Sequence, residues 1–229
     1  MSHTSRSVLD KDLQAIQDDV LRMAHLLDQA ISRSLDALGQ QDTRLAEEIV
    51  ADDAQVNALR FRIEEACLAL IATQQPAAGD LRTVIAAMNV VGDMERMADH
   101  AAGVARLVLT MGGQPLLKPL IDIPRMVEFC RTMVRESLQA FVARDPEKAR
   151  QVATQDNTID ALYKQIFREL LSFMVEDPST TSRALYLLFA AHNYERIGDR
   201  ATNIAERVIF MASGEMRELN PEPPDAAHL

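Results

Sequence analysis

The sequence predicts an all-α protein made of two tandem three-helix bundles, and three observations support this prediction. Among the 229 residues there are 8 Gly, 3 Tyr and no Trp, whereas residues that favour helices, such as Ala, Leu, Arg and Glu, are abundant. Apolar residues recur every three or four positions through long segments. The second half also repeats features of the first. Very little strand is therefore expected.

The first bundle is predicted to contain helices over residues 9–40, 43–75 and 80–111. Asp42 and Thr43 supply an N-cap for the second helix, Pro76 to Asp80 forms the next turn, and Gly112 ends the third helix. The first helix spans about 45 Å at about 1.5 Å per residue, a length that suits a bundle.

The second bundle is predicted to contain helices over residues 124–143, 146–175 and 180–213. Pro115, Pro119 and Pro124 break the pattern after Gly112, before it restarts. Asp145 and Pro146 form a cap and a first-turn proline for the fifth helix, and Pro178 marks the last turn.

The predicted domains are therefore residues 1–112, a linker over 113–123, residues 124–213, and a disordered Pro-rich acidic tail over 214–229. Equivalent residues are 103 positions apart at Asp53 and Asp156, and 100 apart at Glu95 and Glu195. The second repeat thus has a turn about three residues shorter.

Composition excludes several classes of protein. The net charge of −10, without a basic patch, argues against a nucleic-acid partner. Cys67 and Cys130 lie in apolar helical patterns without metal-type spacing, so packed thiols in a reducing compartment are expected. No apolar signal sequence or membrane span is recognisable. A cytoplasmic protein without direct membrane insertion is predicted.

The most polar helix carries Glu195 and Asp199, and Glu95 and Asp99 repeat this pair one hundred positions earlier. A spacing of four residues places both carboxylates on one side of a helix, opposite an apolar stripe. The acidic stripe is expected to face outward.

Antiparallel helices place residues equally far from a turn at the same height. In the second repeat this pairs Asp160 with Glu195 and Asp156 with Asp199, and in the first it pairs Asn57 with Glu95 and Asp53 with Asp99. Clustered carboxylates repel one another unless a cation neutralises them, and oxygen ligands suit Mg²⁺, Mn²⁺, Ca²⁺ or iron better than copper or thiolate-type zinc. The predicted metal ligands are Asp53, Asn57, Glu95, Asp99, Asp156, Asp160, Glu195 and Asp199.

Other interpretations of this cluster remain open. A solvated acidic face, with arginines as salt-bridge partners, needs no metal, and His100 and His192 are either further ligands or surface residues. There is no Glu-x-x-His pair, Gly-rich phosphate loop or Gly-x-Ser-x-Gly motif. A metal-dependent phosphohydrolase nevertheless stays an alternative, because carboxylate-bound ions can activate water.

These residues resemble the PhoU-type regulators of phosphate uptake over about residues 9–213. The family pattern is Asp-x-Glu-Arg-(Ile/Met)-x-Asp-x-x-x-Asn-Ile. The first repeat matches it at Asp93, Glu95, Arg96, Met97 and Asp99, and the second at Glu195, Arg196, Ile197, Asp199, Asn203 and Ile204. Asn193, Gly103 and Asn57 depart from the pattern, so a weaker first metal site is expected.

The resemblance implies a non-enzymatic adaptor with multinuclear metal clusters, the ion being iron, manganese, magnesium or zinc. It implies negative control of phosphate uptake and of the phosphate regulon, through the ATPase subunit of a phosphate ABC transporter and a sensor histidine kinase. A homodimer is expected from the long exposed bundles. A metal-free helical scaffold is the remaining alternative.

Overall fold

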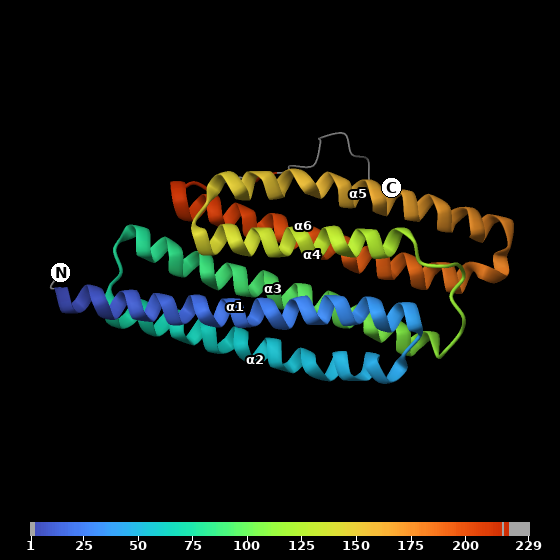
Figure 1. Cartoon of the computed structure of the whole chain (residues 1–229), viewed down its shortest axis with the longest axis horizontal. Helices are drawn as coiled ribbons and strands as arrows, with labels where there is room; N and C mark the ends of the chain where they lie inside the picture. The colour runs from blue at the N-terminus through green and yellow to red at the C-terminus, as the bar shows by residue number, and fades with distance from the viewer. Residues whose placement is uncertain (1–2, 217, 220–229) are drawn as a thin grey trace.

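The chain forms two layers of long helices, as the computed structural model shows over its described residues, 3–216 and 218–219 (Figure 1). Those residues contain six α-helices, one 3₁₀ turn and no strand, which confirms the predicted all-α class. The elements are α1 (His3–Gln40), α2 (Thr43–Gln74), α3 (Ala78–Met111), α4 (Asp122–Ala143), α5 (Pro146–Glu176), the 3₁₀ turn η1 (Pro178–Thr180) and α6 (Thr181–Ser213).

The helix ends lie within two residues of the predicted positions except at the start of α1, which begins six residues earlier, at His3. Asp42 caps α2 by accepting a hydrogen bond from the backbone amide of Leu45. Asp145 caps α5 by accepting from the amides of Glu147 and Lys148, with Pro146 in the first turn. Gly112 ends α3 in the left-handed conformation, at φ +58°.

The central helices of the molecule are α3 and α6, each of which packs on both helices of its own repeat and on the other central helix. The predicted apolar stripe of α6, which includes Tyr194, Ile197 and Ile204, is fully buried. Buried apolar residues of both repeats form one continuous core. The two repeats therefore pack on each other along their central helices and are not separate domains joined only by a linker.

The two central helices run antiparallel, because Asp93 contacts Asn203 while His100 contacts Asn193. Asp93 Oδ1 accepts a hydrogen bond from Asn203 Nδ2 at 3.2 Å and lies 3.4 Å from Arg200 Nη1. On the other side of the crossing, His100 Nδ1 lies 3.0 Å from Asn193 Oδ1. The repeats are thus related by an approximate two-fold rotation.

The segment between the repeats is held against the bundle. Its side chains Leu116, Leu117 and Leu120 pack on the core, and Lys118 forms an ion pair with Glu169 of α5. At the far end, the Leu219 amide donates a hydrogen bond to Glu206 Oε1 at 2.9 Å. The rest of the predicted tail, residues 217 and 220–229, lies outside the described residues.

Both cysteines are free and buried, as expected for packed thiols. Burial raises the pKa of the Cys67 thiol to about 12 and that of Cys130 further still. Within the described residues, no helix combines the length and the apolar character that a membrane span requires.

Candidate functional site

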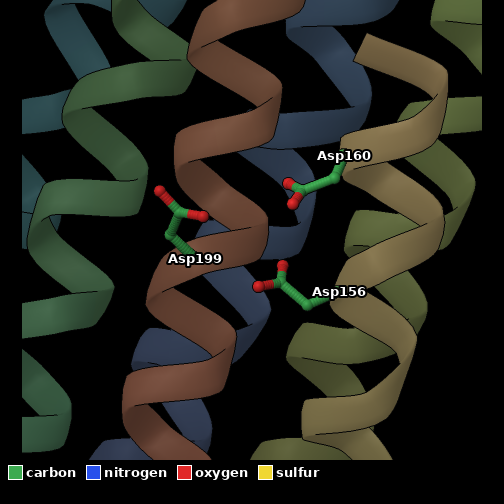
Figure 2. Close-up of side chains that lie close together, drawn as sticks. All are labelled: Asp156, Asp160 and Asp199. Atoms are coloured by element: carbon green, nitrogen blue, oxygen red, sulfur yellow. The ribbon is translucent and has the colours of Figure 1, made fainter. Parts of the chain in front are cut away.

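The acidic residues of the second repeat meet between α5 and α6, as the counting from the turn predicts. Asp156 and Asp160 extend from α5 toward Asp199 on α6 (Figure 2), and one carboxylate oxygen of each lies within 4.8 Å of the others. We define the second-repeat cluster as Asp156, Asp160, Glu195 and Asp199. Of these four predicted ligands, Glu195 lies outside the tight group of three.

The predicted outward orientation of the acidic stripe is wrong in part, because α6 is covered on several sides. Asp156 is buried, and Glu195 and Asp199 are half-buried, with side chains 18% and 29% exposed. A carboxylate in such a position loses much of its hydration, and this cost must be offset by partners or by protonation.

Glu195 bears the largest effect of this crowding. Burial, followed by the negative charge of Asp199, raises the pKa of its carboxyl to about 7, and Asp160 and Asp156 add to the increase. Its Oε2 lies 3.3 Å from His192 Nδ1, in a geometry that does not make a hydrogen bond. Burial also raises the pKa of Asp199, whereas the neighbouring guanidinium of Arg196 lowers it.

Two residues beside this cluster complete its surroundings. The His192 ring lies next to Tyr163, with ring centroids 6.0 Å apart. Burial lowers the pKa of His192, so its imidazole is more readily neutral and able to offer a lone pair.

Arg196 pairs with Asp199, because Arg196 Nη1 donates to Asp199 Oδ2 at 2.7 Å along the same helix. His100, the other candidate histidine, instead faces Asn193 at the contact between repeats.

The second-repeat cluster fits a hard divalent cation. Such ions take several oxygen ligands, and here three carboxylates from two helices converge around one space. A cation bound there would supply positive charge to a crowded group of acids, and Asp156, Asp160 and Asp199 would be its ligands. Glu195 and His192 are placed at the margin.

Close packing of α5 on α6 at this point depends on Gly198. A Cβ atom built on Gly198 would lie 2.7 Å from Ile159 Cδ1 and 3.5 Å from Asp156 Oδ1. The absence of a side chain therefore lets the buried Ile159 approach α6, with Asp156 one turn earlier on the same helix. The equivalent residue of the first repeat is Ala98.

The first repeat does not reproduce this arrangement. We define the first-repeat cluster as Asp53, Asn57, Glu95 and Asp99. Its four members lie on α2 and α3 as predicted, but no triplet of carboxylates as tight as that of the second repeat occurs elsewhere among the described residues. Asn57 Nδ2 donates to Asp53 Oδ2 at 3.3 Å, and Arg60 Nη1 lies 3.2 Å from Glu95 Oε1.

Arg60 is the important residue of this region that sequence analysis missed. Alignment of the halves at the offset of 103 would have placed it opposite Tyr163, since the same offset pairs Asp53 with Asp156. In the first repeat, the guanidinium of Arg60 supplies positive charge to Glu95 from within the protein. The first-repeat cluster therefore does not fit a metal ion as well as the second-repeat cluster does.

Fold and site together define a class: a tandem-repeat helical protein with carboxylate clusters between the second and third helix of each repeat. The PhoU domain family matches residues 20–108 and 123–208, one match in each repeat. The chain belongs to the PhoU family.

Relatives cover nearly the whole chain. The phosphate-specific transport system accessory protein PhoU homologue of Zymomonas mobilis is 40% identical over 94% of this chain and 90% of its own length. Its homologue of the same name in Aquifex aeolicus is 39% identical over 91% of this chain and 94% of that protein.

Solved structures agree with the fold. PhoU from Pseudomonas aeruginosa superposes with a TM-score of 0.85 and 35% identity, covering 90% of this chain and 99% of that one. The phosphate transport system regulatory protein PhoU from Streptococcus pneumoniae also gives 0.85, at 30% identity over 91% of this chain and 99% of that one.

Proposed function

We propose that this protein is a negative regulator of phosphate uptake and of the phosphate-starvation response. It acts in the cytoplasm as an adaptor between the ATPase subunit of a phosphate ABC transporter and a sensor histidine kinase. The observation that carries the proposal is family membership over both repeats, with relatives named as accessory or regulatory proteins of phosphate transport. Catalysis is not part of the role.

The surface of the second repeat supports a docking role. Phe167, Leu171 and Val175 recur every four residues along α5 and are 41%, 46% and 75% exposed. Leu68 occupies the position equivalent to Leu171 in the first repeat and is also exposed. Exposed apolar stripes on long helices are typical of surfaces that bind other proteins.

The second-repeat cluster is proposed to bind iron, manganese, magnesium or zinc, of which the first three suit its oxygen ligands best. Three convergent carboxylates in a half-buried position support this assignment. The bound ion would neutralise the cluster and fix α5 against α6. A homodimer is proposed as the form that presents these surfaces.

A complementation experiment tests the regulatory role. In a bacterium whose own PhoU gene is deleted, a phosphate-starvation reporter should be active in phosphate-rich medium, and expression of this chain should repress it. A variant with Phe167, Leu171 and Val175 changed to Ser should retain helical circular dichroism but fail to repress. A chain that does not restore repression would contradict the proposed function.

Elemental analysis tests the metal. Protein purified without an affinity tag or chelator is compared with Asp156→Ala/Asp160→Ala/Asp199→Ala and with a control variant, Glu47→Ala/Glu65→Ala/Glu176→Ala, at exposed glutamates. Metal is expected in the wild type and the control but not in the cluster variant. Equal metal in all three proteins would disprove the site. Phosphate-ester hydrolysis that disappears in the cluster variant would favour the phosphohydrolase alternative.

A further inference from the structure

Beside the first-repeat cluster lies the guanidinium of an arginine, at the position where the second repeat has a tyrosine. Arg60 of α2 is equivalent to Tyr163 of α5. Its Nη1 lies 3.2 Å from Glu95 Oε1 on α3, and its Nε donates to Glu64 Oε1 on α2 at 2.9 Å. Arg60 therefore links the two helices that carry the cluster.

The guanidinium is held in position by more than one contact. Besides its two carboxylate partners, its central carbon lies 5.5 Å from the centroid of the Phe61 ring. Arg196 of the second repeat differs, because it pairs with Asp199 on its own helix and is 40% exposed. Arg196 thus pairs within one helix beside its cluster, whereas Arg60 contacts both Glu64 on α2 and Glu95 of its cluster on α3.

The remaining ligands of the first repeat are also poorer. Asn57 replaces the carboxylate of Asp160 and turns an N–H group, which cannot bind a cation, toward Asp53. Asp99 is exposed, whereas its equivalent Asp199 is half-buried. Asp53 Oδ1 is buried without a hydrogen-bond partner, but among the described residues Asp53 belongs to no group of three carboxylates as tight as that of the second repeat.

Charge leads to the same conclusion. The second-repeat cluster has four carboxylates, whereas the first has three, of which Glu95 pairs with the guanidinium of Arg60. Burial and the charge of Asp99 raise the pKa of Asp53, and the charge of Arg106, which stands where the second repeat has Glu206, opposes them. An incoming cation would meet less attraction and a fixed positive charge.

We propose that Arg60 is the permanent counter-cation of the first-repeat cluster and that this repeat binds no metal ion of its own. This inference rests on the proposed metal site in the second repeat for its contrast. Only the second repeat would then bind a metal ion, although the two repeats are related by a nearly two-fold rotation.

Metal content after loading with Mn²⁺ tests the proposal. Glu95→Gln/Asp99→Asn should keep the full wild-type amount of Mn²⁺, whereas Asp160→Ala/Asp199→Ala should lose it. Loss of Mn²⁺ from the first-repeat variant would overturn the proposal.

A reciprocal exchange sharpens this test. Asn57→Asp/Arg60→Tyr gives the first repeat the residues of the second and should add Mn²⁺ beyond the wild-type content. Tyr163→Arg in the second repeat should lower the content. If Asn57→Asp/Arg60→Tyr and Tyr163→Arg both keep the Mn²⁺ content of the wild type, Arg60 does not exclude the ion from the first repeat.

A second readout separates this proposal from the proposed metal site. If wild-type protein binds no Mn²⁺, the second-repeat site fails, and Arg60 is judged by stability after chelator treatment. Arg60→Gln should lower the Tm by about 2–4 °C, because Glu95 loses its counter-charge. Arg44→Gln, at a side chain 84% exposed, is the control. Equal Tm values for the two variants would overturn the role of Arg60.

Discussion

Asn193 lies directly against Gly103, so that a Cβ atom on Gly103 would be only 2.9 Å from Asn193 Oδ1. Both residues depart from the family pattern, and the structure shows that the departures face each other across the α3–α6 contact. On the other side of the same crossing, Asp93 and Asn203 keep the usual residues and form a hydrogen bond. The two departures therefore compensate each other.

Replacement of Gly103 should depend on residue 193. Gly103→Ala gains about 1 kcal/mol of helix propensity but displaces the Asn193 carboxamide from its contact with His100. In an Asn193→Ala background that displacement has no cost. Urea unfolding of both single variants and the double variant should give a favourable coupling of about 1 kcal/mol. Additive changes would show that the close approach has no energetic weight.

Gly198→Ala should weaken the second-repeat cluster. The added methyl group would lie 2.7 Å from Ile159 Cδ1 and 3.5 Å from Asp156 Oδ1, so the buried Ile159 side chain must shift within the contact that positions Asp156 relative to Asp199. Lower Mn²⁺ affinity is expected by calorimetric titration. Gly92→Ala is the matched control, because nothing lies within 4 Å of its added Cβ. That variant should be stabilised by up to about 1 kcal/mol, with affinity unchanged.

Metal-free protein should lose stability as the pH rises through the range in which the Glu195 carboxyl loses its proton. Its carboxyl has a pKa of about 7 in the folded protein against 4.5 normally, so the folded state binds the proton more tightly. Its contribution to the free energy of unfolding is thus greatest at low pH and declines between about pH 4.5 and 7. Glu195→Gln should remove this decline, since its side chain cannot ionise.

Denaturant titrations of both proteins from pH 4.5 to 8 measure this contribution as a difference. The comparison is needed because His192, whose pKa is lowered, acts in the opposite direction. A wild-type protein that gains stability relative to Glu195→Gln as pH rises would contradict the prediction.

Ser34→Ala should destabilise the protein more than Ser137→Ala. These serines are equivalent and buried, and each donates to a carbonyl one turn earlier, of Ile31 and Val134 respectively. Only Ser34 also lies 3.0 Å from the hydroxyl of the fully buried Tyr194. Loss of this partner should cost about 1–3 kcal/mol. Thermal unfolding of the two variants measures the difference.

Much of the fold could be predicted from local signals. Asp42 and Asp145 are caps in the structure as expected, and Gly112 ends α3 with a positive φ. These signals depend on neighbours in sequence, so they need no tertiary information. Equal distance from a turn also brought Asp156 near Asp199, because antiparallel helices have a constant rise.

Contacts between the repeats could not be predicted in the same way. Periodicity identifies which side of α6 is apolar but not which helix covers it, so the antiparallel crossing with α3 was missed. The burial of the acids follows from that crossing and was missed with it. Arg60 escaped notice for another reason: its significance depends on Glu95, a contact between helices that a single sequence does not reveal.

The approximate two-fold relation of the repeats affects how the molecule assembles. The α3–α6 contact is isologous in form, like the interface of a homodimer made from single repeats. The short connection between α3 and α4 replaces that bimolecular encounter with an intramolecular one, at an effective concentration set by its length. A chain cleaved between Gly113 and Leu116 would therefore be expected to persist as a complex of two halves, whose dissociation becomes visible only on dilution.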